Sequence, residues 1–214
     1  MRTGIKSFLD KILHPIGLNI ERYFGNELAL KSLINIAKEY EIDLILDIGA
    51  NSGQFSKKII NAGYQNELIS FEPLSSAYGY LLKNSKSFPK WSVYEKCAIG
   101  DFDGEVDINI SLNNHSSSIL QINKEHTDAA PSAVYIDNEK VKIFKLDSIQ
   151  SSFSKSKNIL LKIDTQGFEK NVIDGARVLI HERVKIIQLE MSLLSLYEGV
   201  FPFDKMVTFL NELG

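Results

Sequence analysis

The chain has 214 residues, 44% of them hydrophobic, and a formal net charge of −3. That length fits one α/β domain whose core needs no disulfide. The mild acidity argues against a nucleic-acid binder with a basic face. The single Cys97 excludes an intramolecular disulfide and any C-x-x-C site. No run approaches the roughly 20 apolar residues of a transmembrane helix and no signal peptide is recognisable, so a cytoplasmic location is predicted.

The first part of the chain, residues 1–40, is predicted to be a helical segment that precedes the main domain at 41–214. Residues 1–18 place apolar side chains on one helical face and basic ones opposite. Such a helix can lie on a membrane surface, but packing against its own domain or a second subunit is the favoured interpretation. A further helix is expected at 27–40.

The segment 44–55, "LILDIGANSGQF", predicts a buried strand, a tight turn and the start of a helix. Asp47 closes the strand, and Gly49, Asn51 and Gly53 follow at a spacing of two. Glycine and asparagine tolerate positive φ and let a ligand approach the backbone closely. A strand, such a turn and a helix N-terminus together form a nucleotide-binding corner, and an ordinary strand-to-helix turn is the alternative.

The glycine pattern of this corner separates the nucleotide classes. A dinucleotide fingerprint, G-x-G-x-x-G, requires a glycine where Asn51 stands, and no G-K-[ST] follows for a P-loop. The pattern D-x-G-x-N-x-G is instead the form of the first motif of S-adenosylmethionine-dependent methyltransferases. The sequence therefore predicts S-adenosylmethionine as the cofactor.

Strands and helices alternate along most of the remaining chain, which is typical of a doubly wound parallel sheet in an α/β fold. The expected strands are 67–73, 91–100, 158–164 and 184–192, and the expected helices are 75–86, 167–182 and 203–213. The alternation stops at 101–146, where 104–111 and 140–146 indicate two antiparallel strands. Between them, the polar segment 112–138 is long enough to be a functional lid or a mobile loop.

Four acids lie at or near the carboxyl ends of predicted strands: Asp47, Glu72, Asp164 and Glu190. Ligands of an open α/β sheet bind beyond these ends. Each acid alone could cap a helix, but four converging carboxylates repel one another unless a cation is present. The sulfonium and ammonium groups of S-adenosylmethionine meet that need. Glu72 is placed to accept hydrogen bonds from both ribose hydroxyls, as in nicotinamide sites, and Pro73 fixes the turn after it.

Six segments occur in an order and spacing that resemble the FkbM family of S-adenosylmethionine-dependent methyltransferases: "DIGANSGQFS", "FEP", "CAIGDFDGEV", "LDSI", "LLKIDTQGFEKNVIDGA" and "IIQLEMS". The resemblance runs from about residue 40 to 213 and implies a Rossmann-like class I methyltransferase sheet with an antiparallel insertion at about 101–146. Family members are mostly O-methyltransferases acting on hydroxyls of macrolides, sugars and other glycoconjugates. Their general fold closes with a C-terminal β-hairpin, for which no residues remain here. Either the sequence is truncated or another chain finishes the open sheet edge, as in a homo-oligomer.

The residues expected to carry the chemistry lie at the ends of the last two strands. An aliphatic hydroxyl is a poor nucleophile, so a base must take its proton. Asp164 is the first candidate, with Gln166 and Glu169 in the turn after it. Glu190 is the second candidate, unless it is a buried acid that pairs with Lys162 or with a backbone amide.

Three further positions have an expected role beside a structural alternative. His115, in the long polar segment, is a candidate base or a solvated loop residue. Asp101 is expected to accept the adenine amino group or to serve as a turn residue. No metal is predicted, although Asp147 could join two other acids around magnesium. The predicted cofactor-binding residues are Asp47, Gly49, Asn51, Gly53, Glu72, Pro73, Asp101 and Asp164.

The leading hypothesis is an S-adenosylmethionine-dependent O-methyltransferase whose acceptor is a hydroxyl of a sugar, glycoconjugate or polyketide-like small molecule. The acceptor pocket is expected between the insertion and the loop 195–203, whose Tyr197, Phe201 and Phe203 could equally be packing residues. Two other functions stay open, a non-catalytic nucleotide-binding module of the same fold and an NAD-dependent oxidoreductase. No nucleic acid is expected as a partner.

Overall fold

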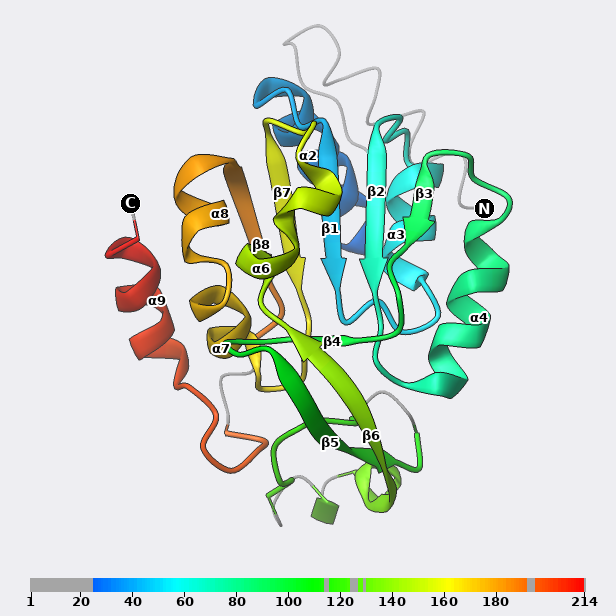
Figure 1. The fold of residues 1–214 in the computed structure, drawn as a ribbon, viewed down its shortest axis with the longest axis vertical. Helices are drawn as coiled ribbons and strands as arrows, with labels where there is room; N and C mark the ends of the chain where they lie inside the picture. The colour runs from blue at the N-terminus through cyan, green and yellow to red at the C-terminus, as the bar shows by residue number, and fades with distance from the viewer. Residues whose placement is uncertain (1–24, 114–115, 124–126, 129, 192–194, 214) are drawn as a thin grey trace, which may run out of the picture.

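The computed structural model describes residues 25–113, 116–123, 127–128, 130–191 and 195–213. The helix expected at 1–18, and its proposed membrane or packing role, lie outside these residues. The described chain forms a five-stranded parallel sheet with helices on both faces, and a three-stranded sheet beyond its carboxyl edge (Figure 1). The predicted α/β fold with a parallel sheet is confirmed. None of the described helices is long and apolar enough to cross a membrane.

The strands of the parallel sheet are, in spatial order, β3 (Trp91–Val93), β2 (Glu67–Phe71), β1 (Leu44–Ile48), β7 (Ile159–Ile163) and β8 (Val184–Leu189). Every neighbouring pair is parallel. The chain runs outward from β1 to β3 and then crosses back to place β7 on the other side of β1. That reversal is a topological switch point, where open α/β sheets bind ligands.

Successive residues of β1 point to opposite faces of the sheet, so the sheet has a core on each side. Ile45 packs with buried residues of the first three helices, whereas Leu44 and Leu46 pack with those of the later ones. The helices on the first face are α2 (Gly25–Glu39), α3 (Gln54–Asn61) and α4 (Ser75–Ser85). Those on the second are α6 (Leu146–Ile149), α7 (Glu169–Asp174), α8 (Arg177–Glu182) and α9 (Phe203–Asn211).

The smaller sheet consists of β4 (Ala98–Ile99), β6 (Tyr135–Phe144) and β5 (Gly104–Ser111), in that order. β5 is antiparallel to β6, and β4 runs parallel to β6. The single strand expected at 91–100 is wrong, because β3 and β4 belong to different sheets. Between β3 and β4, Lys96 forms an ion pair with Glu139 of β6, which ties this connection to the smaller sheet.

The helix expected at 167–182 is also wrong, because the chain breaks at Gly175 into α7 and α8. A Cβ atom on Gly175 would lie 1.8 Å from the carbonyl oxygen of Gly100, so the segment after β4 passes directly against this position. The carboxylate of Asp147 accepts hydrogen bonds from the N–H groups of Val178 and Leu179, at 3.0 and 2.9 Å, and starts α8 anew. Contacts with distant segments therefore divide one predicted helix into two.

The two ends of the described chain pack on the sheet as helices. Ile34 and Ala37 of α2 are buried in the core of the first face. Among the described residues beyond β8, α9 is the regular element, so β8 forms the edge of the sheet in this part of the chain. Two short 3₁₀ helices lie at Pro131–Ala133 and Gln150–Phe153.

Candidate active site

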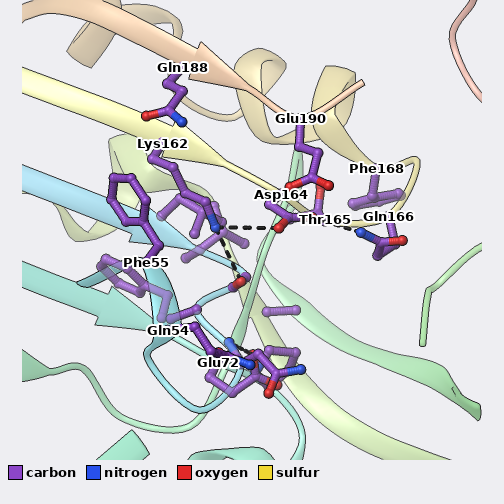
Figure 2. Close-up of a pocket in the computed structure, with 18 of the residues that line it drawn as sticks. Gln54, Phe55, Glu72, Lys162, Asp164, Thr165, Gln166, Phe168, Gln188 and Glu190 are labelled. Atoms are coloured by element: carbon purple, nitrogen blue, oxygen red, sulfur yellow. Dashed lines mark hydrogen bonds and ion pairs between the residues drawn. The ribbon is translucent and has the colours of Figure 1, made fainter. Parts of the chain in front are cut away.

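A cavity of about 920 Å³ lies at the carboxyl ends of the parallel strands (Figure 2). Its volume is at the upper end of the roughly 300–1,000 Å³ that is usual for small-molecule sites. The β1–α3 turn, the ends of β2, β7 and β8, and parts of α2, α3 and β4 line it. The predicted site residues in this lining are Gly49, Asn51, Glu72, Pro73, Asp164 and Glu190.

The turn between β1 and α3 combines positive φ angles with the close approach of neighbouring segments. Gly49 has a φ of +74°, and a Cβ atom there would lie 1.9 Å from the carbonyl oxygen of Asp164, at the end of β7. Asn51 follows with a φ of +49°. Gly53 has a φ of +86°, and its Cβ atom would lie 2.5 Å from the indole ring of Trp91. The space beside Gly53 is thus filled by the core rather than open to the cavity.

Asp47 is fully buried, outside the cavity lining, and holds a polar network that crosses the sheet. Its Oδ2 atom accepts a hydrogen bond from Ser56 Oγ at 2.6 Å, and its Oδ1 atom lies 3.0 Å from Lys162 Nζ. The hydroxyl of Ser56 lies 3.0 Å from that of Ser70, which accepts a hydrogen bond from Trp91 Nε1 at 2.9 Å. Asp47 therefore supports the turn through the protein interior.

Glu72 lies at the end of β2 and connects this side of the cavity to the β1–α3 turn. Its Oε2 atom accepts a hydrogen bond from the Asn51 N–H at 2.8 Å, and its Oε1 atom accepts one from the Leu74 N–H at 3.0 Å. Burial raises the pKa of Glu72 to about 7. Because each carboxylate oxygen has a second lone pair, Glu72 can still accept hydrogen bonds from a bound diol. Pro73 follows it in the lining.

Lys162 is a buried cation at the centre of the site. Its ammonium lies 3.0 Å from Asp47 Oδ1, 3.6 Å from Asp164 Oδ2 and 5.5 Å from the centre of the Phe55 ring. Burial alone lowers the pKa of Lys162, but the charges of Asp47 and Asp164 outweigh burial and hold that pKa above its usual value. Lys162 thus pairs with these two aspartates, not with Glu190, the alternative considered from the sequence.

Asp164 is held on both carboxylate oxygens. Gln166 Nε2 donates a hydrogen bond to Oδ1 at 2.8 Å, while Oδ2 faces Lys162. Gln166 is itself fixed, because Tyr197 Oη donates a hydrogen bond to its Oε1 atom at 3.0 Å. The backbone of Gln166 has a φ of +56°, which a non-glycine residue adopts only when its surroundings hold it there.

Glu190 follows β8 and lies beside Asp164 in the cavity (Figure 2). The pKa of the Glu190 carboxyl is raised, first by the charge of Asp164 and then by burial.

Glu169, the other acid near this site, stabilises the turn after β7. Its Oε1 atom accepts hydrogen bonds from the N–H groups of Thr165 and Gly167, both at 3.0 Å, so it holds the turn in place.

The remaining predicted positions lie elsewhere. Asp101 is exposed, accepts a hydrogen bond from Asn171 Nδ2 at 3.1 Å and is not in the cavity lining. His115 lies outside the described residues. Asp147 starts α8, away from Asp164, and the described chain contains no group of three or more His, Cys, Asp or Glu residues that could hold a metal ion.

Only one aromatic residue of the 195–203 loop borders the turn after β7. Tyr197 is buried against Gln166. Phe201 instead packs edge-on against Phe209 of α9, with ring centres 5.7 Å apart, and Phe203 is exposed. The packing alternative therefore holds for Phe201.

Several residues of the lining were not predicted from the sequence. Three of them had a usable signal. Gln188 lies two positions before Glu190 at the end of one strand, so the two share a face, and Gln54 and Phe55 open a helix directly after the glycine turn. The unpredicted residues that the site uses are Gln54, Phe55, Ala98, Ile99, Lys162 and Gln188.

Comparison with known proteins places this chain in a family. A family model described as the Methyltransferase FkbM domain matches residues 47–214. The 2-O-methyltransferase NoeI of Sinorhizobium fredii (strain NBRC 101917 / NGR234) is 27% identical over 217 residues, which cover 98% of this chain and 88% of that protein. The resemblance found in the sequence motifs is thereby confirmed, and the chain belongs to the FkbM methyltransferase family.

Proposed function

We propose that the protein is an S-adenosylmethionine-dependent O-methyltransferase that acts on a hydroxyl of a sugar, glycoconjugate or polyketide-like small molecule. The observation that carries the proposal is a cavity with carboxylates at both ends. Glu72 lies at one end, and Asp164 and Glu190 lie at the other. Within the described lining, Lys58 and Lys162 offset only part of this negative charge, so a cationic ligand is favoured.

The lining residues fit each part of that cofactor. Glu72 would accept hydrogen bonds from the ribose hydroxyls, and the apolar wall of Ala98 and Ile99 suits a planar base. The Gly49 turn and the carboxylate of Asp164 would hold the cationic methionine end. The bound cofactor supplies a methyl group on a positively charged sulfur.

The chain's own residues supply the remaining catalytic elements. The turn after β7 is fixed by Gln166 and Glu169 and holds the Asp164 carboxylate beside the place where the acceptor must lie. Alignment of this kind provides most of the acceleration in a displacement reaction. Gln54, Gln188 and the Phe55 ring offer amide groups and an aromatic face to a polyhydroxylated acceptor. The name of the NoeI relative, a 2-O-methyltransferase, supports a hydroxyl as the acceptor group.

The test is a panel of hydroxylated sugars and polyketides incubated with the protein and S-adenosylmethionine. We expect one of them to gain the mass of a methyl group with release of an equal amount of S-adenosylhomocysteine. Cofactor binding without S-adenosylhomocysteine release on any acceptor would instead indicate a non-catalytic binding module. Tight binding of NAD without binding of S-adenosylmethionine would indicate an oxidoreductase.

Binding of S-adenosylhomocysteine is expected to tighten as the pH rises through about 7, the pKa of the buried Glu72. The ionised carboxylate accepts the Asn51 and Leu74 N–H bonds and those of the ribose, whereas protonation removes one acceptor position. Calorimetric titrations on either side of that pH measure the effect. In Glu72→Gln, binding should be weaker and this pH dependence absent, and a variant that keeps it would exclude Glu72 as its source.

A further inference from the structure

The two carboxyl groups at the methyl-transfer end of the cavity differ in how the protein holds them. Asp164 is occupied on both oxygens, by Gln166 Nε2 at 2.8 Å and by Lys162 Nζ at 3.6 Å. Gln166 is anchored in turn by Tyr197, at 3.0 Å, and its backbone carbonyl oxygen accepts a hydrogen bond from Ser118 Oγ at 2.7 Å. Asp164 is therefore fixed in orientation and paired with a buried cation.

Glu190 is placed by the backbone and left with an accessible side chain. Its N–H donates a hydrogen bond to the carbonyl oxygen of Ile163 at 3.0 Å, which sets it next to Asp164 across the β7–β8 pair. The residue is exposed and lines the cavity, and its carboxyl points toward Asp164 (Figure 2). Glu190 is the more exposed of these two acids, so an incoming hydroxyl reaches it more readily than Asp164, which keeps its partners.

The charges around Glu190 favour the same assignment. Asp164 and Lys162 face it from β7, and Glu169 faces it from α7. The repulsion from Asp164, followed by burial, raises the pKa of Glu190 despite the opposite effect of Lys162. A carboxylate with a raised pKa is a stronger base, which favours its action as a general base.

We propose, resting on the O-methyltransferase function above, that Glu190 takes the proton of the acceptor hydroxyl and that Asp164 is a positioning residue. The O–H electron pair stays on the acceptor oxygen as that oxygen bonds to the methyl carbon. The S–CH₃ bond breaks with its electron pair left on sulfur, which gives S-adenosylhomocysteine and a methyl ether. The proton passes to Glu190 and then to solvent through the exposed side of the residue. This assignment reverses the order of the two acids expected from the sequence.

The test compares single-turnover methyl transfer by Glu190→Gln and Asp164→Asn as a function of pH, at saturating S-adenosylmethionine and with the acceptor that the wild type methylates fastest. Glu190→Gln should lower the rate by about 10²–10⁴-fold and abolish the fall in rate at acid pH, while S-adenosylhomocysteine affinity stays near that of the wild type. Glu190→Asp should restore part of the rate together with this fall in rate at acid pH, the acid limb of the pH profile. Asp164→Asn should keep the acid limb but move it to lower pH, because the largest charge acting on Glu190 is gone.

Glu198→Gln is the matched control, since Glu198 is an exposed acid of the same loop region outside the cavity lining, and it should behave as the wild type. Loss of the acid limb in Asp164→Asn together with its retention in Glu190→Gln would overturn the assignment. So would a normal rate in Glu190→Gln while the wild type is active. If the wild type methylates no acceptor at all, the proposed function itself fails, which is a separate result.

Discussion

The Lys162→Met variant is expected to lose about 3–5 kcal/mol of its free energy of unfolding. It removes the ammonium that lies 3.0 Å from the buried Asp47 and 3.6 Å from Asp164, so a buried carboxylate is left without its cation. Methionine keeps an unbranched chain of similar length beside the Phe55 ring, so the loss of charge dominates over the loss of packing. Urea denaturation followed by circular dichroism measures the difference.

Two further variants separate the buried charge from a general lysine effect. Adding Asp47→Asn to Lys162→Met should recover most of the lost stability, because the uncompensated carboxylate is removed. Lys142→Met breaks an ion pair with Glu95 whose side chains are 60% and 52% exposed, and it should change stability by no more than about 1 kcal/mol. Equal losses in Lys162→Met and Lys142→Met would contradict a structural role for the buried pair.

Gly49→Ala is expected to cost about 2–5 kcal/mol of stability, the sum of strain at positive φ and of overpacking. At a φ of +74°, the new methyl group would lie 1.9 Å from the carbonyl oxygen of Asp164, and a backbone atom at the end of β7 cannot yield without displacing the turn that follows. Because that turn lines the cavity, affinity for S-adenosylhomocysteine should fall at least about tenfold, or 1.4 kcal/mol. Calorimetry on the folded variant gives the affinity.

Gly63→Ala is the matched control for Gly49→Ala. Gly63 also has a positive φ, +113°, but no atom lies within 4 Å of the position that its Cβ would take. This variant should show only backbone strain, about 1–2 kcal/mol, with unchanged cofactor affinity. If both alanine variants lost the same stability and kept the same affinity, the close approach of β7 to Gly49 would have no energetic role.

Local sequence patterns predicted the elements that position the site. Three patterns can each be interpreted from a few neighbouring residues: the apolar run ending at Asp47, the small residues after it and the acid at Glu72. The order of the elements then indicated a parallel sheet, whose carboxyl ends collect such residues. The glycine turn, Glu72, Asp164 and Glu190 indeed line one cavity.

Features that depend on which distant segments become neighbours could not be predicted in this way. Asp47 and Lys162 are register partners on adjacent strands, although they lie far apart in the sequence. Their pairing is therefore visible only once β1 and β7 are known to be adjacent. The break between α7 and α8 has the same origin, since Gly175 meets Gly100. Local periodicity contains no information about either contact.

The contact between Gln166 and the insertion has a consequence for engineering new acceptor preferences. Ser118 and Tyr197 both bind Gln166, and Tyr197 forms a bridge with Ile122 of the insertion. A chimaera that exchanges the insertion with that of a relative would therefore alter acceptor selection and the orientation of Asp164 together. Keeping a hydroxyl at position 118 and a tyrosine at position 197 should let the loops be redesigned while the reacting groups stay aligned.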